Sequence, residues 1–281
     1  MARLFIGRSG CFYRHWEKEV FYPTGLLRKE QLRYYSEFFS TVELNSPSYR
    51  LPSESTFLRW YDLTPEDFLF TVKVSRFISH VKYLRDCEIP WFTFYQRSER
   101  LKKKLGPFLI QLPPNWKRNL ARLEEFIQML KNISPKEKIA FEFRHISWFD
   151  KEVYNFFGEQ RNITMVQTDS ARWPSTPKIA GSFVYVRMHG APILYGSKYS
   201  EKYLTFTFLT RITLGQIWHS SIWLERVWFE SIWTKLMVYL MCELENFGKL
   251  SNYMIGLVVL LHRRSTARIK PTGLHSCLLG S

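Results

Sequence analysis

Seven short runs of the chain alternate apolar with polar side chains, which is the pattern of β-strands whose two faces meet different surroundings. In the run at 68–75, for example, Val72 and Val74 alternate with Thr71 and Lys73. Several runs also become more polar toward their carboxyl ends, where active sites of parallel α/β folds are found. The seven predicted strands are 4–9, 41–45, 68–75, 107–112, 138–144, 164–169 and 183–189.

Helical segments are predicted between most of these strands. The clearest follows Asn119, a residue type that favours helix N-caps, and places Leu120, Leu123 and Ile127 on one face. The predicted helices are 28–39, 53–62, 90–105, 119–131 and 147–160.

The alternation of strands and helices predicts an α/β fold with a parallel sheet. No glycine-rich phosphate loop of the Gly-x-Gly-x-x-Gly or Walker type follows a predicted strand, which argues against a nucleotide-binding doubly wound sheet. We therefore expect a (β/α)8 TIM-barrel-like fold. Only seven units are evident, so we expect it to be incomplete or irregular at the C-terminal strand.

Six charged residues occupy the strand positions that alternate with the apolar outer ones. On an inner face they must neutralise one another, because an unpaired buried charge costs several kcal/mol. A set of salt bridges that only fills the interior is the alternative to a functional site. The acids are Glu43, Glu142 and Asp169, and the bases are Lys73, Arg144 and Arg187.

Composition narrows the class of protein. The 281 residues are 46% hydrophobic, enough for a large core, and the formal net charge of +15 is compatible with a polyanionic ligand or with a solvated basic surface. The N-terminus has no secretory-signal pattern, and the longest apolar run, 254–261, is too short to span a membrane. We expect a soluble cytoplasmic protein with no membrane partner. The pattern does not indicate an oligomeric state.

Six motifs, in order along the chain, resemble the YecE-like family known as domain of unknown function 72. They are IGRSGCFYRHWEKEVFYPTGL, YYSEFFSTVELNSPSYRLPSESTFLRW, TPEDFLFTVKVSRFISHVKYLRDCE, GPFLIQLPPNW, AFEFRHISWF and FVYVRMHG, and the resemblance covers about 4–204. It implies a TIM-barrel-like fold and an unassigned activity. Comparison of such proteins with endonuclease-IV-like barrels suggests phosphate or nucleic-acid binding, by analogy of fold.

The chain departs from the family pattern after Tyr203. The family's last strand usually reads like VYVYFNND, whereas here Trp218, Trp223, Trp228 and Trp233 recur every five residues, a spacing of neither strand nor helix. We expect a TIM-barrel-like domain over 1–204 and a divergent or frameshifted, poorly ordered or irregular tail over 205–281, which leaves an open edge between the first and seventh strands. Alternatively, the run at 253–261 supplies a replacement strand.

The expected function is binding of a phosphate-containing or nucleic-acid ligand at the carboxyl-end mouth of the barrel. The alternative is a hydrolase of phosphoester or glycosidic bonds, with Glu43 and Glu142 as general acid and base. Candidate catalytic residues are Glu43, Glu142, Arg144, Asp169 and His189. Candidate ligand-binding residues are Tyr13, Trp16, Asn45, Lys73, His80, Gln111, His145 and Arg187.

Several candidates also have a structural interpretation. Tyr13 and Trp16 can simply fill the top of the barrel, and His145 and His189 can be hydrogen-bonded loop residues. We expect no cofactor. His145, His189, Asp169 and Glu142 include the ligand types of a metal site, but no spacing such as H-E-x-x-H is present and the four cysteines form no C-x-x-C pair, so the sequence does not support a metal.

Overall fold

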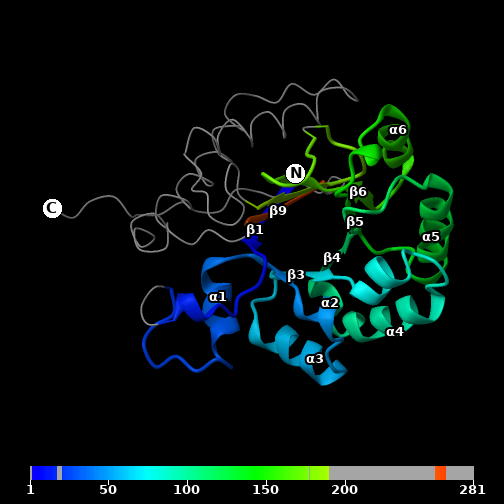
Figure 1. Ribbon diagram of the computed structural model, residues 1–281. Helices are drawn as coiled ribbons and strands as arrows, with labels where there is room; N and C mark the ends of the chain where they lie inside the picture. The colour runs from blue at the N-terminus through cyan, green and yellow to red at the C-terminus, as the bar shows by residue number, and fades with distance from the viewer. Residues whose placement is uncertain (1, 18–20, 177, 190–256, 264–281) are drawn as a thin grey trace, which may run out of the picture.

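The computed structural model describes residues 2–17, 21–176, 178–189 and 257–263 (Figure 1). These residues form one nine-stranded sheet in the order β6-β5-β4-β3-β2-β1-β9-β8-β7. Neighbours from β1 to β6 are parallel, as are β7 and β8, whereas β9 is antiparallel to both its neighbours. The strands are β1 (Ala2–Arg8), β2 (Thr41–Leu44), β3 (Leu69–Lys73), β4 (Leu105–Gln111), β5 (Ile139–Glu142), β6 (Ile163–Met165), β7 (Gln167–Asp169), β8 (Val184–Met188) and β9 (Leu257–Arg263).

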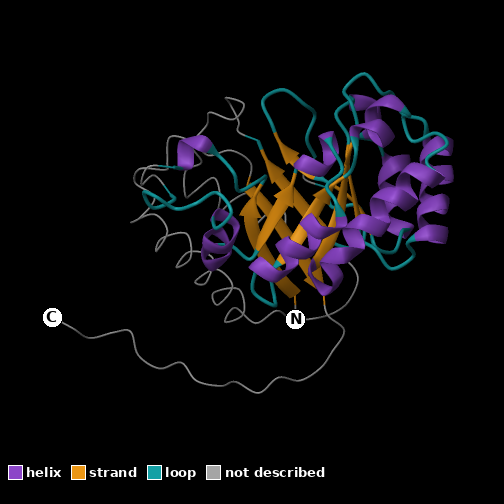
Figure 2. Ribbon diagram, turned by 90° about the horizontal axis from the view of Figure 1, so that it is seen from below, coloured by secondary structure: helices purple, strands orange, loops and turns teal. Residues whose placement is uncertain are grey.

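The helices follow one another around the outside of the strands (Figures 1 and 2). Three begin at residues whose side chains accept a backbone N–H of the first turn: Ser53, Asn119 and Asp150. The α-helices are α1 (Gln31–Phe38), α2 (Ser46–Tyr49), α3 (Glu54–Leu63), α4 (Glu88–Ser98), α5 (Leu120–Ile133) and α6 (Lys151–Glu159). Short non-α helical turns are η1 (Arg14–Trp16), η2 (Phe77–Val81), η3 (Glu99–Lys104) and η4 (Ile146–Trp148).

The predicted parallel α/β architecture is confirmed in its order of elements. Each of the seven predicted strands overlaps an observed one, and the run at 164–169 contains two short strands, β6 and β7, on either side of Val166. β6 pairs with β5, and β7 pairs with β8. The two strands at the ends of the sheet order are therefore separated by one residue in the chain.

The expectation of an open edge beside the first strand is wrong for the described residues. β9 lies there and pairs with β1 from Ala2 to Arg8 and with β8 from Val184 to Met188. β9 overlaps the run at 253–261, which was the alternative expectation for a replacement strand. It is antiparallel to its neighbours, however, whereas the strands of a (β/α)8 barrel are parallel. The rest of the predicted tail, 205–256 and 264–281, lies outside the described residues.

Apolar side chains cover both faces of the sheet. The larger cluster packs strands against helices and includes Phe70, Phe108 and Phe141. A smaller cluster on the opposite face, called the inner face below, joins residues of several strands, including Phe5 of β1 and Leu109 of β4. Its buried members are Phe5, Leu109, Ala140, Val166, Phe183 and Tyr185.

One part of the predicted alternation is wrong. Met165 packs in the helix-side cluster, and Val166 belongs to the inner cluster. Thr168 pairs in register with Arg187, and Asp169 with Met188. Residues paired in register share a face, so Asp169 lies on the opposite face from Arg187. Met165 and Val166 are both apolar, and their pattern therefore did not say which of them faces inward.

Candidate functional site

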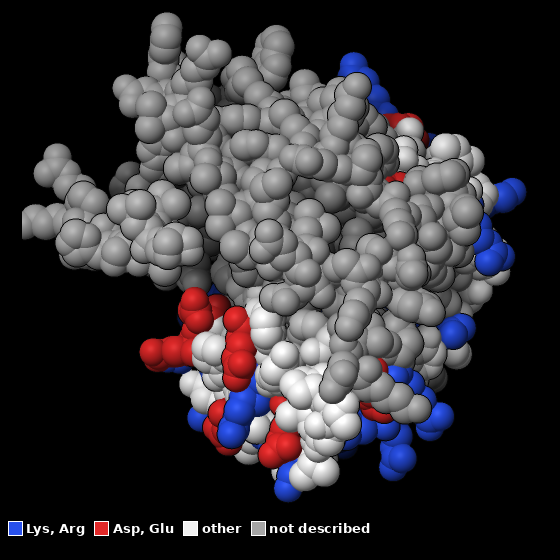
Figure 3. Space-filling model, turned by 90° about the vertical axis from the view of Figure 1, so that its left-hand side faces the viewer, with Lys and Arg blue, Asp and Glu red and all other residues white. Residues whose placement is uncertain are grey.

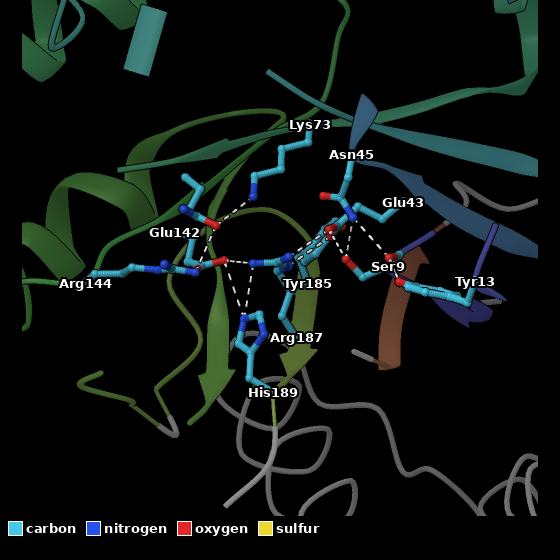
Figure 4. A network of polar contacts seen from close by, with 11 residues as sticks. Ser9, Tyr13, Glu43, Asn45, Lys73, Glu142, Arg144, Tyr185, Arg187 and His189 are labelled. Atoms are coloured by element: carbon cyan, nitrogen blue, oxygen red, sulfur yellow. Dashed lines mark hydrogen bonds and ion pairs between the residues drawn. The ribbon is translucent and has the colours of Figure 1, made fainter. Parts of the chain in front are cut away.

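Charged side chains gather on the inner face where the strands end (Figure 4). They follow the apolar inner residues along the same strands: Ala140 precedes Glu142 on β5, and Tyr185 precedes Arg187 on β8. We call this group the inner charge cluster. It consists of Glu43, Lys73, Glu142, Arg144 and Arg187.

Arg187 lies at the centre of the cluster and is 4% exposed. Its Nε donates to Glu43 Oε2 at 2.9 Å and its Nη2 to Glu43 Oε1 at 2.7 Å, a two-point contact between guanidinium and carboxylate. Its Nη1 donates to Glu142 Oε2. One guanidinium therefore joins β8 to β2 and β5, and the predicted pairing of these three charges is confirmed.

The Glu43 carboxylate is fully buried and accepts two further hydrogen bonds. Tyr185 Oη donates to Oε2 at 2.8 Å, and Ser9 Oγ donates to Oε1 at 2.7 Å. Burial alone would raise the pKa of Glu43, but Arg187 and Lys73 outweigh burial and lower it below its usual value. Glu43 is thus an ionised carboxylate that holds Arg187 in place.

Glu142 is held in the same way by two arginines. Arg144 Nε donates to its Oε1 at 2.8 Å, and Arg187 contacts Oε2. Burial would raise the pKa of Glu142, yet Arg187 and Arg144 lower it well below its usual value. Both carboxylates of the expected acid–base pair are therefore ionised at neutral pH.

Two cations of the cluster meet at a neutral oxygen. Lys73 Nζ and Arg144 Nη2 each lie 2.9 Å from Gln111 Oε1. No carboxylate of the described residues lies within 4.0 Å of Lys73 Nζ. Burial, followed by the charge of Arg187, lowers the pKa of Lys73 to about 8.

Trp173, which follows β7, was not anticipated from the sequence. The guanidinium carbon of Arg144 lies 3.7 Å from the centroid of the Trp173 ring, a close cation–π contact. The same ring packs edge-on against His189 with centroids 6.1 Å apart. The loop after β7 therefore contributes an aromatic surface beside the inner charge cluster.

His189 borders the cluster as a neutral imidazole. Burial and the neighbouring Arg187 lower its pKa, so its Nε2 accepts from Arg187 Nη1 at 3.2 Å and its 3.9 Å approach to Glu142 is not an ion pair. The backbone N–H of His189 donates to the carbonyl of Asp169. Asp169 is buried beside the cluster, but its strand register excludes it from the expected inner ring.

The remaining candidates divide into mouth and core residues. Asn45 Nδ2 donates to Ser9 Oγ at 2.8 Å, and Tyr13 Oη donates to the Ser9 carbonyl, beside the Glu43 end of the cluster (Figure 4). Trp16, by contrast, is 2% exposed and stacks on Tyr35 in the helix-side core. The expectation that Trp16 lines the mouth is therefore wrong, and its apolar ring area explains its burial.

The two other candidate histidines make local contacts. His145 Nδ1 accepts the backbone N–H of Ser147 at 3.2 Å and caps the short turn η4. His80 Nδ1 lies 2.9 Å from Ser79 Oγ, and burial together with the charge of Arg76 lowers its pKa to about 4. Both imidazoles are half-buried.

The described residues show neither a metal-ion cluster nor a membrane-spanning helix. They contain no group of three or more His, Cys, Asp or Glu side chains placed to hold a metal ion. None of the helices they form has the length and apolarity needed to cross a membrane.

Three cations and two carboxylates give the inner charge cluster one net positive charge while Lys73 is protonated. The carboxylates fix the arginines through short, charge-assisted hydrogen bonds, and burial strengthens these interactions. The guanidinium donors of Arg144 and Arg187 are thereby held in fixed orientations.

Comparisons with known proteins agree with this fold. A DUF72 family protein from Thermotoga maritima, known from its crystal structure, is 30% identical with a TM-score of 0.64, over 75% of this chain and 86% of that one. A DUF72 family protein from Enterococcus faecalis has a TM-score of 0.55 at 22% identity, over 66% of this chain and 81% of that one, and supports the fold alone.

Two bacterial proteins match part of the sequence. The UPF0759 protein YecE of Escherichia coli K12 is 33% identical over 145 residues, 50% of this chain and 52% of that protein. The UPF0759 protein YunF of Bacillus subtilis is 28% identical over 166 residues, 54% of each. The chain thus spans about half the length of these relatives. The model of the family described as "Protein of unknown function DUF72" matches residues 5–217, and the chain belongs to this family.

Proposed function

We propose that the carboxyl-end mouth of the sheet binds a phosphate-bearing small molecule. The observation that carries the proposal is the meeting of Lys73 Nζ and Arg144 Nη2 at one neutral oxygen, Gln111 Oε1, at 2.9 Å each. A phosphate oxygen presents the same acceptor to the same two donors, with a negative charge added. An anion therefore gains more from this pair than the amide does.

Electrostatics and preorganisation support the same conclusion. The inner charge cluster carries one excess positive charge, and Arg144 is already fixed by Glu142 and by the Trp173 ring. An incoming anion thus does not have to order a mobile arginine, whose lost side-chain freedom would otherwise reduce affinity.

We infer that the sheet closes around this site as a TIM-barrel-like fold that is irregular at its C-terminal strand, the antiparallel β9. β6 and β7, the ends of the strand order, flank the single residue Val166. Val166 packs in the inner cluster with Phe5 of β1 and Leu109 of β4, which are distant in the strand order. In such barrels ligands bind at the carboxyl ends of the strands, where the inner charge cluster lies.

The hydrolase alternative is the weaker candidate. A general acid must hold a proton near neutral pH, whereas the pKa values of Glu43 and Glu142 are both lowered. Glu43 in addition accepts hydrogen bonds from Arg187, Tyr185 and Ser9, which occupy both its oxygens.

A nucleic-acid ligand is a second candidate, supported by exposed rings near the mouth. The guanidinium of Arg76 lies 6.0 Å from the ring of Tyr49, and Lys82 Nζ lies 5.9 Å from that of Phe77. Exposed rings combined with cations are typical of single-strand binding. Against it, acidic side chains lie among the basic ones in the lower part of the face in Figure 3, so the basic side chains do not form an unbroken patch over that part.

Calorimetric titration of the full chain with inorganic phosphate at pH 7 tests the proposal. We expect saturable binding that weakens as salt rises and as pH rises through about 8, where Lys73 loses its proton. Lys73→Met should weaken it at least tenfold. Lys103→Met is the matched control, because Lys103 is exposed and pairs with Glu66.

Three outcomes separate the candidates. Equal affinity in the Lys73→Met and Lys103→Met variants, or no phosphate binding at all, would refute the phosphate site. Oligonucleotide binding that depends on Tyr49 but not on Lys73 would favour the nucleic-acid candidate instead.

A further inference from the structure

Lys73 is half-buried and differs in its surroundings from Lys104, a buried lysine of the described chain. The Nζ of Lys104 donates to the carbonyls of Tyr61 and Thr64, so the ammonium group closes the end of α3. The Nζ of Lys73 ends instead at the mouth, with the side-chain amide of Gln111 as its hydrogen-bond partner. Lys104 has a structural role that needs its charge, whereas Lys73 donates to a neutral amide oxygen, a hydrogen bond that an unprotonated amine also makes.

Groups on or just after β2, β5 and β8 act on the charge of the Lys73 amine. Arg187 of β8 and Arg144, after β5, disfavour its charge, while Glu43 of β2 and Glu142 of β5 favour it. His80 of η2 is neutral at pH 7 because its pKa is about 4. Burial and Arg187 prevail, and the pKa of Lys73 is about 8. A useful fraction of its amine is therefore unprotonated and nucleophilic near neutral pH.

We propose that Lys73 forms an imine with a phosphorylated aldehyde or ketone bound at the mouth. The inference rests on the proposed function, because the phosphate group is what brings the carbonyl to this lysine. Arg144 holds the phosphate, and the carbonyl carbon lies against Lys73 Nζ. The two nitrogens share one acceptor oxygen, so a three-carbon sugar phosphate is long enough to reach both.

The reaction balances without an oxidant or a reductant. The lone pair of Lys73 Nζ attacks the carbonyl carbon and forms the C–N bond, and a proton moves from nitrogen to the former carbonyl oxygen to give a carbinolamine. A second proton, taken from solvent in place of the one that the ammonium group released, lets that oxygen leave as water, and the C=N bond forms. The resulting iminium carries the positive charge that the ammonium group carried, so Glu43 and Glu142 face the same charge as before.

Reductive trapping tests the proposal. The full chain is incubated at pH 7.5 with glyceraldehyde 3-phosphate and sodium borohydride, which delivers hydride to the imine carbon and leaves a stable secondary amine. We expect one adduct per chain by intact mass, assigned to Lys73 by peptide mapping. Inorganic phosphate should suppress it, and glyceraldehyde without the phosphate should label at least tenfold less.

Two comparisons control for general lysine reactivity. Lys104 is buried and hydrogen-bonded to carbonyls, so its peptide should stay unlabelled in the same sample. Lys73→Arg has no primary amine and should lose the adduct, whereas Lys103→Met, which changes an exposed lysine outside the site, should keep it.

The outcomes distinguish this inference from the proposed function. Phosphate binding without an adduct at Lys73 would overturn the imine and leave the function standing. Equal labelling by glyceraldehyde and glyceraldehyde 3-phosphate, unaffected by phosphate, would show a reactive lysine and contradict the phosphate site. Adducts spread over many surface lysines would overturn the inference.

Discussion

Arg187→Met removes the central cation of the inner charge cluster while keeping an unbranched side chain. The change leaves the buried carboxylates of Glu43 and Glu142 without the donor that joins them. Because Arg187 is 4% exposed and both carboxylates are buried, water cannot replace its hydrogen bonds. Breaking a buried ion pair by removing one partner costs about 3–5 kcal/mol.

The pH dependence of stability should also change sign. In the native protein both carboxylates have lowered pKa values, so their contribution to stability is present above about pH 4.5 and is lost as pH falls through the lower folded-state values. Without Arg187, burial dominates and raises at least one of these pKa values above its unfolded value. The folded variant then binds the extra proton, and its stability should fall as pH rises from 5 to 8.

Urea unfolding at pH 5, 6.5 and 8 measures both effects. The matched control is Arg118→Met, because Arg118 also meets two carboxylates, Asp150 and Glu152, but on the surface. Exposed pairs contribute about 0–1 kcal/mol, so the control should change the free energy of unfolding little at any pH. If Arg187→Met costs no more than Arg118→Met, the inner charge cluster is not the buried, paired network described above.

Three further predictions follow from other parts of the fold. Trp173→Ala should weaken phosphate binding about fivefold in a calorimetric titration, since one cation–π contact on the mouth arginine contributes about 1 kcal/mol; unchanged affinity would remove the ring from the site. Gly7→Ala should destabilise the protein by roughly 1–3 kcal/mol in urea unfolding, because an added Cβ would lie 1.8 Å from the Thr41 carbonyl oxygen. At Gly158, in α6, an added Cβ meets nothing within 4 Å, so Gly158→Ala should stabilise the helix by about 0.5–1 kcal/mol. In mass-spectrometric thiol labelling at pH 8, Cys11 and Cys87 should react far more slowly in the native than in the denatured protein. The reason is that burial raises the pKa of both thiols, to about 11 for Cys87. Equal labelling rates in the two states would contradict the burial of these thiols.

The sequence predicted the pairing at the centre of the site because alternation along a buried strand is physically strict. Phe141 and Phe143 pack toward helices, which leaves Glu142 for the inner face, and the same reasoning selects Arg187 on its strand. Charges of opposite sign that are buried on the same inner face then have to pair. At Asp169 the alternation predicted the wrong face. Met165 and Val166 upstream are both apolar, so either of them could have faced inward.

Other features depend on contacts that no local pattern encodes. Trp173 lies in a loop without periodicity, and only the tertiary structure brings its ring onto Arg144. Trp16 is amphipathic enough for either mouth or core, and packing against Tyr35 decides for the core. β9 is strand-like in sequence, but its place between β1 and β8 is set by long-range pairing.

The most direct test of the phosphate site is a crystal of the full chain soaked in tungstate, a heavy tetrahedral oxyanion whose anomalous signal locates it. We predict a peak at the mouth with its oxygens within hydrogen-bond distance of Lys73 Nζ and Arg144, displacing Gln111 Oε1 from one or both. The peak should be absent in Lys73→Met crystals. An empty mouth in the native protein, or a peak that survives in that variant, would contradict the account.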